Sequence, residues 1–450
     1  MKNIKIQTVI ILFTLFSSSF AHAVEIYFEK DASLPLVYVS AAFRGGATQD
    51  PENKSGLTDL MGKLMLRGTK NKSKQQIDLA LDQLGASLEF DTRLEFIAFR
   101  GIVLSENLPQ FLGLLDEILV TPSFRTQDLE KLKKEQSSQL LDELAQDRNL
   151  IKLRFEETFF KGHPYSKPVS GKIKDIQSIT AADLQKQYQK LINETQMVVL
   201  GAGDTNQNAF NTFLQDMKSK RNQVSALTPL PDFTTEPKKL RVMIFDKPDR
   251  TQTQVMIGQK GVSIKEPQID ALQLANHAFG GSSFQARLMV ELRVKRGWTY
   301  GAGSNFRLGS KNHSWRLAFF PKNADTAPAI KVALSMVSDL KKSGITEAEF
   351  NSSKQGLVNG AGFNFNTPQK RLENKLIEVL YGLPEGYFKN YANRLSALSL
   401  VQVNSAIQKF ITPDQLFVGV VGTSSVSRSE IAKALSLKET DVEVQDYQKE

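Results

Sequence analysis

The chain repeats itself at a spacing of roughly 220 residues, which restricts it to folds built from two related halves. Four pairs of segments share this spacing, with shifts between 218 and 221. The pairs are VYVS at 37–40 with VMIG at 255–258, FRTQDLEKLKKEQ at 124–136 with ITEAEFNSSKQGL at 345–357, QKLINETQMVVL at 189–200 with QKFITPDQLFVG at 408–419, and the capping patterns Thr180/Asp183 and Ser399/Gln402. Because the four shifts agree within three residues, an internal duplication explains them better than independent coincidences.

Each half alternates strand-like and helix-like segments. SLEFDTRLEFIAFRGIVL at 87–104 and NHSWRLAFF at 312–320 alternate as β-strands do. The amphipathic segments LPQFLGLLDEIL at 108–119 and APAIKVALSMVSDLKKS at 327–343 follow them as helices. Strands followed by helices that can cover one sheet face predict an α+β fold.

The first 23 residues have the features of a secretory signal peptide. Two lysines precede an apolar run from Val9 to Phe16, and AHA at 21–23 offers a small-residue cleavage site. The run is too short to span a bilayer, so we expect an exported chain without a membrane anchor, in the periplasm if the signal is bacterial. There is no cysteine for a disulfide or a lipid anchor.

The charge balance argues against nucleic acid as a partner. The formal net charge is +9, and the loss of Lys2 and Lys5 with the leader lowers it to +7. No block of Lys and Arg with interleaved aromatic residues occurs, so the mild excess does not indicate nucleic-acid binding.

A linker divides the mature chain. LTPLPDFTTEPKKL at 227–240 concentrates proline and threonine and lacks periodicity. The predicted organisation is therefore a signal peptide at 1–23, an N-terminal half at 24–226, a linker at 227–240 and a C-terminal half at 241–450.

The stretch GLTDLMGKLMLRGT at 56–69 resembles the motif of the pitrilysin/insulinase family of zinc metallopeptidases. Active members read Gly-x-x-His-x-x-Glu-His-Met-x-Phe-x-Gly-Thr, in which the histidines bind zinc and the glutamate activates water. On that frame Asp59 replaces the first histidine, Gly62 the glutamate and Lys63 the second histidine. We therefore expect a degenerate zinc motif and no metal bound by this chain.

Two neighbouring positions support the same interpretation. The family's third ligand, a glutamate on a later helix, falls near Leu140 by spacing, beside Asp142 and Glu143. Active relatives also place Asn-Ala in the following strand, where GASLEFDT has Glu89 and Phe90. The metal helix and the strand beside it are changed together.

The second half keeps more of the family pattern. FGGSSFQARLMVELRVKRGWTYGAGSNF at 279–306 resembles the segment in which members carry an arginine and a tyrosine that act at a zinc site in another half or another chain. Arg293 and Tyr300 match this pair. A guanidinium and a phenol can hydrogen-bond a peptide carbonyl and stabilise the oxyanion formed in hydrolysis. Taken alone, an ordinary surface arginine and a strand-packing tyrosine are the competing interpretation.

The resemblance covers nearly all of the mature chain and implies a fold and a partner. It implies that each half is a pair of similar α+β domains and that the halves form a clamshell around a central cavity. Some bacterial members divide their work between a chain that bears His-x-x-Glu-His and a chain that retains only the Arg/Tyr pair. The sequence is similar to the second kind. This implies a substrate-binding subunit of a periplasmic heterodimeric zinc peptidase, inactive alone, whose partners are a zinc-bearing paralogous subunit and peptide substrates.

Two alternatives remain open at this point. The chain could be a peptide-binding or scaffold protein of the same fold, homodimeric or not, without any link to proteolysis. It could also be a metallopeptidase with unconventional ligands such as Asp59 and Asp142. The identity of the peptides, the permanence of the complex and the opening of the clamshell do not follow from the residues.

Overall fold

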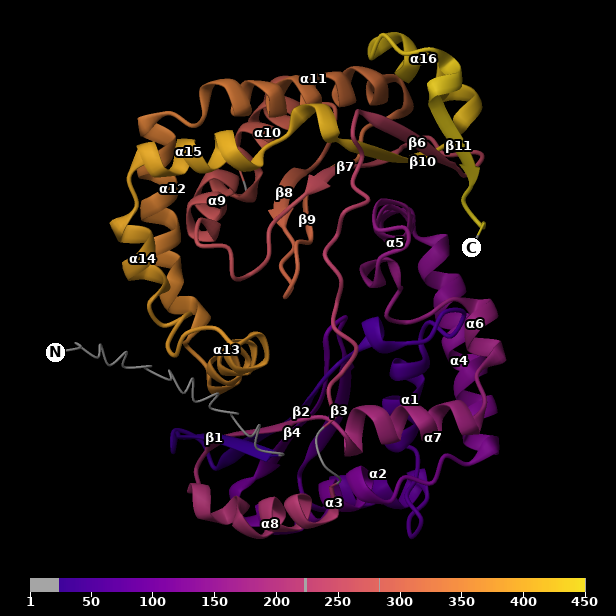
Figure 1. The fold of residues 1–450 in the computed structure, drawn as a ribbon, viewed down its shortest axis with the longest axis vertical. Coiled ribbons are helices and arrows are strands. Elements are labelled where there is room, and N and C mark those ends of the chain that lie inside the picture. Colours follow the sequence, from indigo (N-terminus) through magenta and orange to yellow (C-terminus); the bar gives the residue numbers. More distant parts are fainter. Residues whose placement is uncertain (1–23, 222–224, 283, 450) are drawn as a thin grey trace, which may run out of the picture.

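Two mixed β-sheets, one in each half of the chain, form the framework of the computed structural model, which describes residues 24–221, 225–282 and 284–449 (Figure 1). The strand order is β1-β5-β2-β4-β3 in the first sheet and β11-β6-β10-β7-β9-β8 in the second. The expected signal peptide at 1–23 lies outside the described residues. Within the described residues, no helix combines the length and apolar character needed to cross a membrane.

The helices and strands follow one another in the same order in the two halves, except that the second half ends with an additional strand, β11. The first half contains β1 (Val24–Lys30), β2 (Leu36–Arg44), α1 (Leu57–Met65), α2 (Lys74–Gln83), β3 (Ser87–Thr92), β4 (Phe96–Leu104), α3 (Leu108–Val120), α4 (Thr126–Ala145), α5 (Asp147–Phe159), α6 (Ile173–Ser178), α7 (Ala181–Tyr188), β5 (Met197–Gly203) and α8 (Asn211–Lys220). The second contains β6 (Arg241–Asp246), β7 (Gln254–Lys260), α9 (Ile269–Asn276), α10 (Arg287–Met289), β8 (Ala302–Phe306), β9 (Ser314–Phe319), α11 (Asn323–Ser343), α12 (Glu347–Gly360), α13 (Pro368–Tyr381), α14 (Tyr391–Ala397), α15 (Leu400–Phe410), β10 (Phe417–Gly422), α16 (Ser424–Ala434) and β11 (Val442–Asp446).

Strand pairing confirms that the halves are related. β1 pairs in parallel with β5, which is antiparallel to β2, and β6 pairs in parallel with β10, which is antiparallel to β7. The capping boxes predicted at Thr180 and Ser399 both form, because each hydroxyl accepts the backbone N–H three residues on while the side chain at that position returns the bond. The α+β class and the two homologous halves are therefore confirmed.

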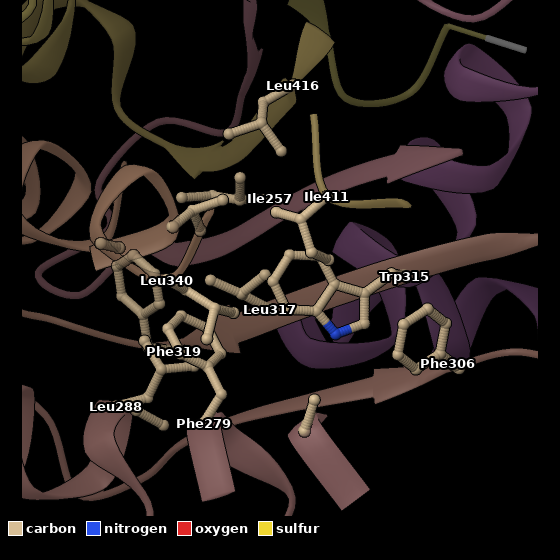
Figure 2. Packing of buried hydrophobic residues seen from close by; sticks show 14 of the residues in the cluster. Ile257, Phe279, Leu288, Phe306, Trp315, Leu317, Phe319, Leu340, Ile411 and Leu416 are labelled. Carbon is tan, nitrogen blue, oxygen red and sulfur yellow. The ribbon is translucent and has the colours of Figure 1, made fainter. Parts of the chain in front are cut away.

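Each sheet buries one face under helices of its own half. In the second half, Ile257, Leu317 and Phe319 project from the sheet towards Phe279 and Leu340 (Figure 2). All five side chains are at most 1% exposed. Full burial of such side chains stabilises a fold by about 1.5–3 kcal/mol each. The core between each sheet and the helices of its own half, here called the outer core, therefore stabilises that half.

The opposite face of each sheet is covered by a helix from the other half (Figure 1). α5 of the first half packs on β7 and β10, and α13 of the second half packs on β2 and β5. Apolar side chains line both contacts: Ile151, Phe155 and Phe159 meet Phe417 in one, and Leu372, Leu376 and Leu380 meet Ala42, Val198 and Leu200 in the other. The halves are thus interlocked by an exchange of helices.

The sheet count corrects one expectation. Among the described residues each half contains one sheet and forms one α+β unit, not the expected pair of similar domains. The physical reason is that five or six strands with helices on both faces already bury both sheet surfaces, so a second sheet per half has no apolar face to cover. The expected linker at 227–240 contains no helix or strand.

A convergence of loops adds a polar contact between the halves. The Tyr165 hydroxyl donates to Glu95 Oε1 at 2.7 Å and accepts the backbone N–H of Lys311 at 3.2 Å. The Tyr165 ring stacks on the His313 ring with centroids 4.6 Å apart. His313, at 1% exposure, is therefore sealed between the first half and the loop that leads into β9.

We expect His313 to make stability depend on pH. Burial, followed by the nearby charges of Arg307 and Arg316, holds the pKa of His313 well below its usual 6.5. Below pH 6.5 the unfolded chain binds a proton that the folded chain refuses, so the free energy of unfolding falls as pH falls, by at most about 1.4 kcal/mol per pH unit. Chemical denaturation of the wild type and His313→Gln between about pH 8 and 5 measures this difference, and the variant should show the shallower pH dependence. Parallel curves for the two proteins would contradict the assignment.

Candidate functional site

The degenerate motif lies on α1, whose start is held by a buried carboxylate. Asp50 accepts the backbone N–H of Gly56 at 2.9 Å and that of Thr58 at 3.0 Å, which satisfies donors that a helix start leaves free. Gly56 has a φ of 87°, in the left-handed region that favours glycine. This frame sets the direction in which Asp59, Gly62 and Lys63 project.

Asp59 and Lys63 bind each other. The Lys63 ammonium lies 2.7 Å from Asp59 Oδ2, one turn along the helix. Gln136 of α4 donates to the same carboxylate oxygen at 3.1 Å, and its own oxygen accepts from Lys63 at 3.4 Å. Thr92 at the end of β3 donates to Asp59 Oδ1 at 3.0 Å. The two motif positions that carry histidines in active relatives therefore form a closed ion-pair network.

Gly62 lies under an aromatic ring. A Cβ placed on Gly62 would stand 1.9 Å from Cζ of Phe90, closer than any real contact. Phe90 itself packs on Phe99 with ring centroids 4.9 Å apart. Phe90 thus occupies the space that a side chain at position 62 would need, and the changes at 62 and 90 are complementary.

These residues do not fit a zinc ion. An ammonium lies where a second neutral ligand would have to approach, and the Asp59 carboxylate is already bonded to an amine, an amide and a hydroxyl. No group of three or more His, Cys, Asp or Glu residues that could hold a metal occurs among the described residues. Asp142, the other residue considered as an unconventional ligand, is exposed on α4. Among the described residues, the hydrogen bonds and the ion pair of Asp59 go to Thr92, Gln136 and Lys63, not to Asp142.

The α4 residue that contacts the motif is Gln136, one helical turn before the Leu140 position that spacing indicated. Spacing pointed to Leu140, which is buried in the outer core, whereas Gln136 faces Asp59 and Lys63. Leu140 and Gln136 share a face of α4 because they are four residues apart. The sequence signal for Gln136 is an amide side chain on the same face of α4 as Leu140. The contact of Thr92 with Asp59 was not predicted from the sequence either.

Arg293 projects from a short π-helical turn, Val290–Lys295, that follows α10. Gly297, with a φ of 65°, ends this turn, and its backbone N–H donates to Arg293 O at 2.9 Å. The half-buried Arg293 guanidinium lies over the exposed Phe284 ring at 5.1 Å. Within the described part of the chain it has no ion pair or hydrogen bond, so its donors are available.

Tyr300 is 78% exposed in the loop that enters β8. Its hydroxyl makes no hydrogen bond to any described residue, and its side chain lines a pocket of about 480 Å³. Arg293 does not line this pocket, and no contact joins the two side chains in the described structure. Unlike Arg293, the neighbouring cations Lys295 and Arg296 form ion pairs, both with Glu291, at 3.0 and 2.9 Å. The structure therefore leaves Arg293 and Tyr300 accessible but does not bring them together.

Two domain models of one family cover most of the chain. Residues 25–172 match the domain described as Insulinase (Peptidase family M16), and residues 178–357 match the Peptidase M16 inactive domain. The chain belongs to the M16 peptidase family. The recognition made from the motif frame is thereby confirmed.

Relatives within the M16 family include chains with and without a peptidase name. "Non-peptidase homolog YmxG" of Helicobacter pylori is 25% identical over 404 residues, which are 88% of this chain and 91% of that protein. "Uncharacterized zinc protease YmxG" of Bacillus subtilis is 21% identical over 87% of this chain and 95% of that protein. The fold matches a crystal structure of a peptidase M16 inactive domain from Pseudomonas fluorescens with a TM-score of 0.82, at 23% identity over 90% of this chain and 97% of that chain.

Proposed function

We propose that this M16-family chain is the non-catalytic, substrate-binding subunit of a heterodimeric periplasmic zinc metallopeptidase that degrades peptides. In this proposal Arg293 and Tyr300 act at the active site of a partner chain that carries the zinc. The observation that carries it is the contrast between two sites. Lys63 and Phe90 fill the place of the metal ligand and the base, whereas the half-buried Arg293 and the exposed Tyr300 keep hydrogen-bond donors that no described residue binds.

The proposed roles of Arg293 and Tyr300 follow from their donor groups. The guanidinium has five N–H donors in a planar fork, and the phenol has one O–H. Aimed at a peptide carbonyl, these donors stabilise the negative charge that develops on its oxygen during hydrolysis. Neither role requires a metal ligand from this chain.

The free edge of the first sheet supports peptide binding. β3 ends the strand order and pairs only with β4 among the described residues. A pocket of about 380 Å³ includes Leu88 and Phe90 in its lining, and one of about 370 Å³ includes Ser87 and Glu89. Since successive side chains of a strand point to opposite faces, an extended peptide added to this edge would place alternate side chains in the two pockets.

The exported location and the alternative function are also proposals. The periplasm is supported by the leader-like residues 1–23. A peptide-binding or scaffold protein without a proteolytic partner, homodimeric or not, remains the second candidate. It is favoured by the relative named a non-peptidase homolog, and a genome that encodes no secreted relative with His-x-x-Glu-His beside this chain would favour it further.

Reconstitution tests the proposed function. The mature chain is purified alone, a paralogous chain with an intact His-x-x-Glu-His is purified alone, and the two are mixed at equal concentration. Cleavage of an internally quenched peptide is followed while the mass of the complex is measured by light scattering. The proposal predicts a one-to-one complex whose turnover exceeds the sum of the separate chains. A homodimer that ignores the paralogue and leaves its activity unchanged would favour the scaffold.

A further inference from the structure

The pocket beside Tyr300 lies on the inner face of the second sheet, under the first turns of α5. α5 contributes Arg148, Ile151 and Lys152, which share one helix face because they are three and four residues apart. The facing wall is built from β7, β8 and β9. The pocket between this wall and α5 has a volume of about 480 Å³. The pocket therefore combines two cationic side chains from one half with the sheet of the other.

The charge in this pocket is uncompensated. No aspartate or glutamate lines it. Arg148 lies over the Phe320 ring at 5.4 Å, and neither Arg148 nor Lys152 forms an ion pair or hydrogen bond with a described residue. The acid nearest in sequence, Asp147, is engaged elsewhere, because it accepts from Lys247 at 2.7 Å. Two cations in a concave, acid-free site attract an anionic group.

The duplicated half shows that this charge is not a requirement of the fold. Gln369, Leu372 and Glu373 of α13 line a pocket on the first sheet, each 221 residues after Arg148, Ile151 and Lys152 of α5, so the pockets on these two inner faces correspond. The first-half pocket, of about 370 Å³, is lined by the carboxylates Glu89 and Glu373 and by the cations Arg100 and Lys370, and Arg100 pairs with Glu373 at 2.8 Å. Acids and cations therefore accompany each other in the first-half pocket, whereas the second-half pocket is lined by cations without an acid.

We infer that the pocket lined by Arg148, Lys152 and Tyr300 binds a carboxylate of an extended peptide. This inference deepens the proposed peptide-binding function and rests on it. The two cations supply the attraction, and the free Tyr300 hydroxyl and the Asn305 and Gln254 amides in the lining supply further polar contacts. A peptide with an acidic side chain, or with a free C-terminal carboxylate, is therefore preferred over its neutral counterpart.

Fluorescence anisotropy with the full mature chain tests the inference. The probes are fluorescein-labelled peptides of one length, with alternating Ala and Glu or alternating Ala and Gln, each with a free or an amidated C-terminus. The amidated Glu peptide reports side-chain carboxylates, and the free Gln peptide reports the C-terminal carboxylate. We expect at least one of these carboxylate peptides to bind roughly five- to tenfold more tightly than the amidated Gln peptide, and the preference to weaken with salt.

The decisive variant is Arg148→Gln/Lys152→Gln, which should abolish the preference while the amidated Gln peptide binds as before. Lys131→Gln/Lys134→Gln is the matched control, since it removes the same charge from exposed positions of α4 that have no ion pair among the described residues. An unchanged preference in the α5 variant, or an equal loss in the control, would overturn the site. Peptide binding without any carboxylate preference would overturn it as well and leave the proposed subunit function intact. Unchanged kinetics in Arg293 and Tyr300 variants would instead remove the subunit function and leave this pocket in place.

Discussion

If the proposed function holds, we expect Arg293→Ala and Tyr300→Phe each to lower kcat of the reconstituted complex by about a hundredfold, because each substitution would remove a donor aimed at the developing oxyanion. Neither substitution is expected to unfold the chain, since Arg293 lies over Phe284 at the surface and the Tyr300 side chain is 78% exposed. Complex formation should persist, so light scattering and peptide cleavage are measured on the same samples. The double variant should lose less than the product of the two single effects if both groups serve one carbonyl.

Arg296→Ala is the matched control for this pair. Arg296 lies in the same segment but is bound to Glu291 at 2.9 Å, so its removal should change turnover by less than about twofold. Full activity of Tyr300→Phe and Arg293→Ala in an intact complex would remove both residues from the proposed site. An equal loss in all three variants would indicate a general charge or packing effect.

Restoring the family's base is expected to damage the fold. Gly62→Glu drives its Cβ and the rest of the side chain into Phe90, whose Cζ would lie 1.9 Å from that Cβ. Overpacking of a buried site costs about 1–3 kcal/mol or more, and the added carboxylate lacks a partner there. We therefore expect the free energy of unfolding, measured by chemical denaturation, to fall by about 3 kcal/mol or more.

Two further variants separate this clash from the effect of a glutamate on a helix. Gly113→Glu on α3 meets nothing within 4 Å at its Cβ and should be neutral or slightly stabilising, since glycine is a poor helix former. Phe90→Ala in the Gly62→Glu background should cost less than Phe90→Ala in the wild type, because the ring is the obstacle. Additive losses at 62 and 90 would show that the two sites do not share the space.

The repeated pattern allowed most of the architecture to be predicted, but not the way the halves interlock. Periodicity shows that α5 and α13 each need an apolar surface to cover, yet it does not state which sheet supplies that surface. Their partners, such as Phe417 for Phe155 and Val198 for Leu376, lie in the other half and far away in sequence. The family resemblance led us to expect two domains in each half, and this expectation was wrong. One sheet per half suffices because a helix of the other half covers its second face.

The candidate site was predictable where chemistry alone decided it. The amino-acid sequence alone shows that two histidines and a glutamate of the family motif are replaced by residues that cannot perform their roles, namely Asp59, Gly62 and Lys63. The contacts that replaced the metal were not visible, since Gln136 and Phe90 act through distances that only packing sets. The accessibility of Arg293 and Tyr300 is likewise a property of the fold, and the proposal that both act on one carbonyl concerns a partner chain that a single sequence does not describe.

The central claim is that hydrolytic capacity is absent from this chain and supplied by its partner. Its most direct test is the cleavage of an internally quenched peptide by the purified mature chain alone, with zinc added and with a chelator added. The account predicts no cleavage above the buffer blank in either condition, because Lys63 and Phe90 occupy the places of the ligand and the base. Zinc-dependent cleavage that Asp59→Ala abolishes would contradict it.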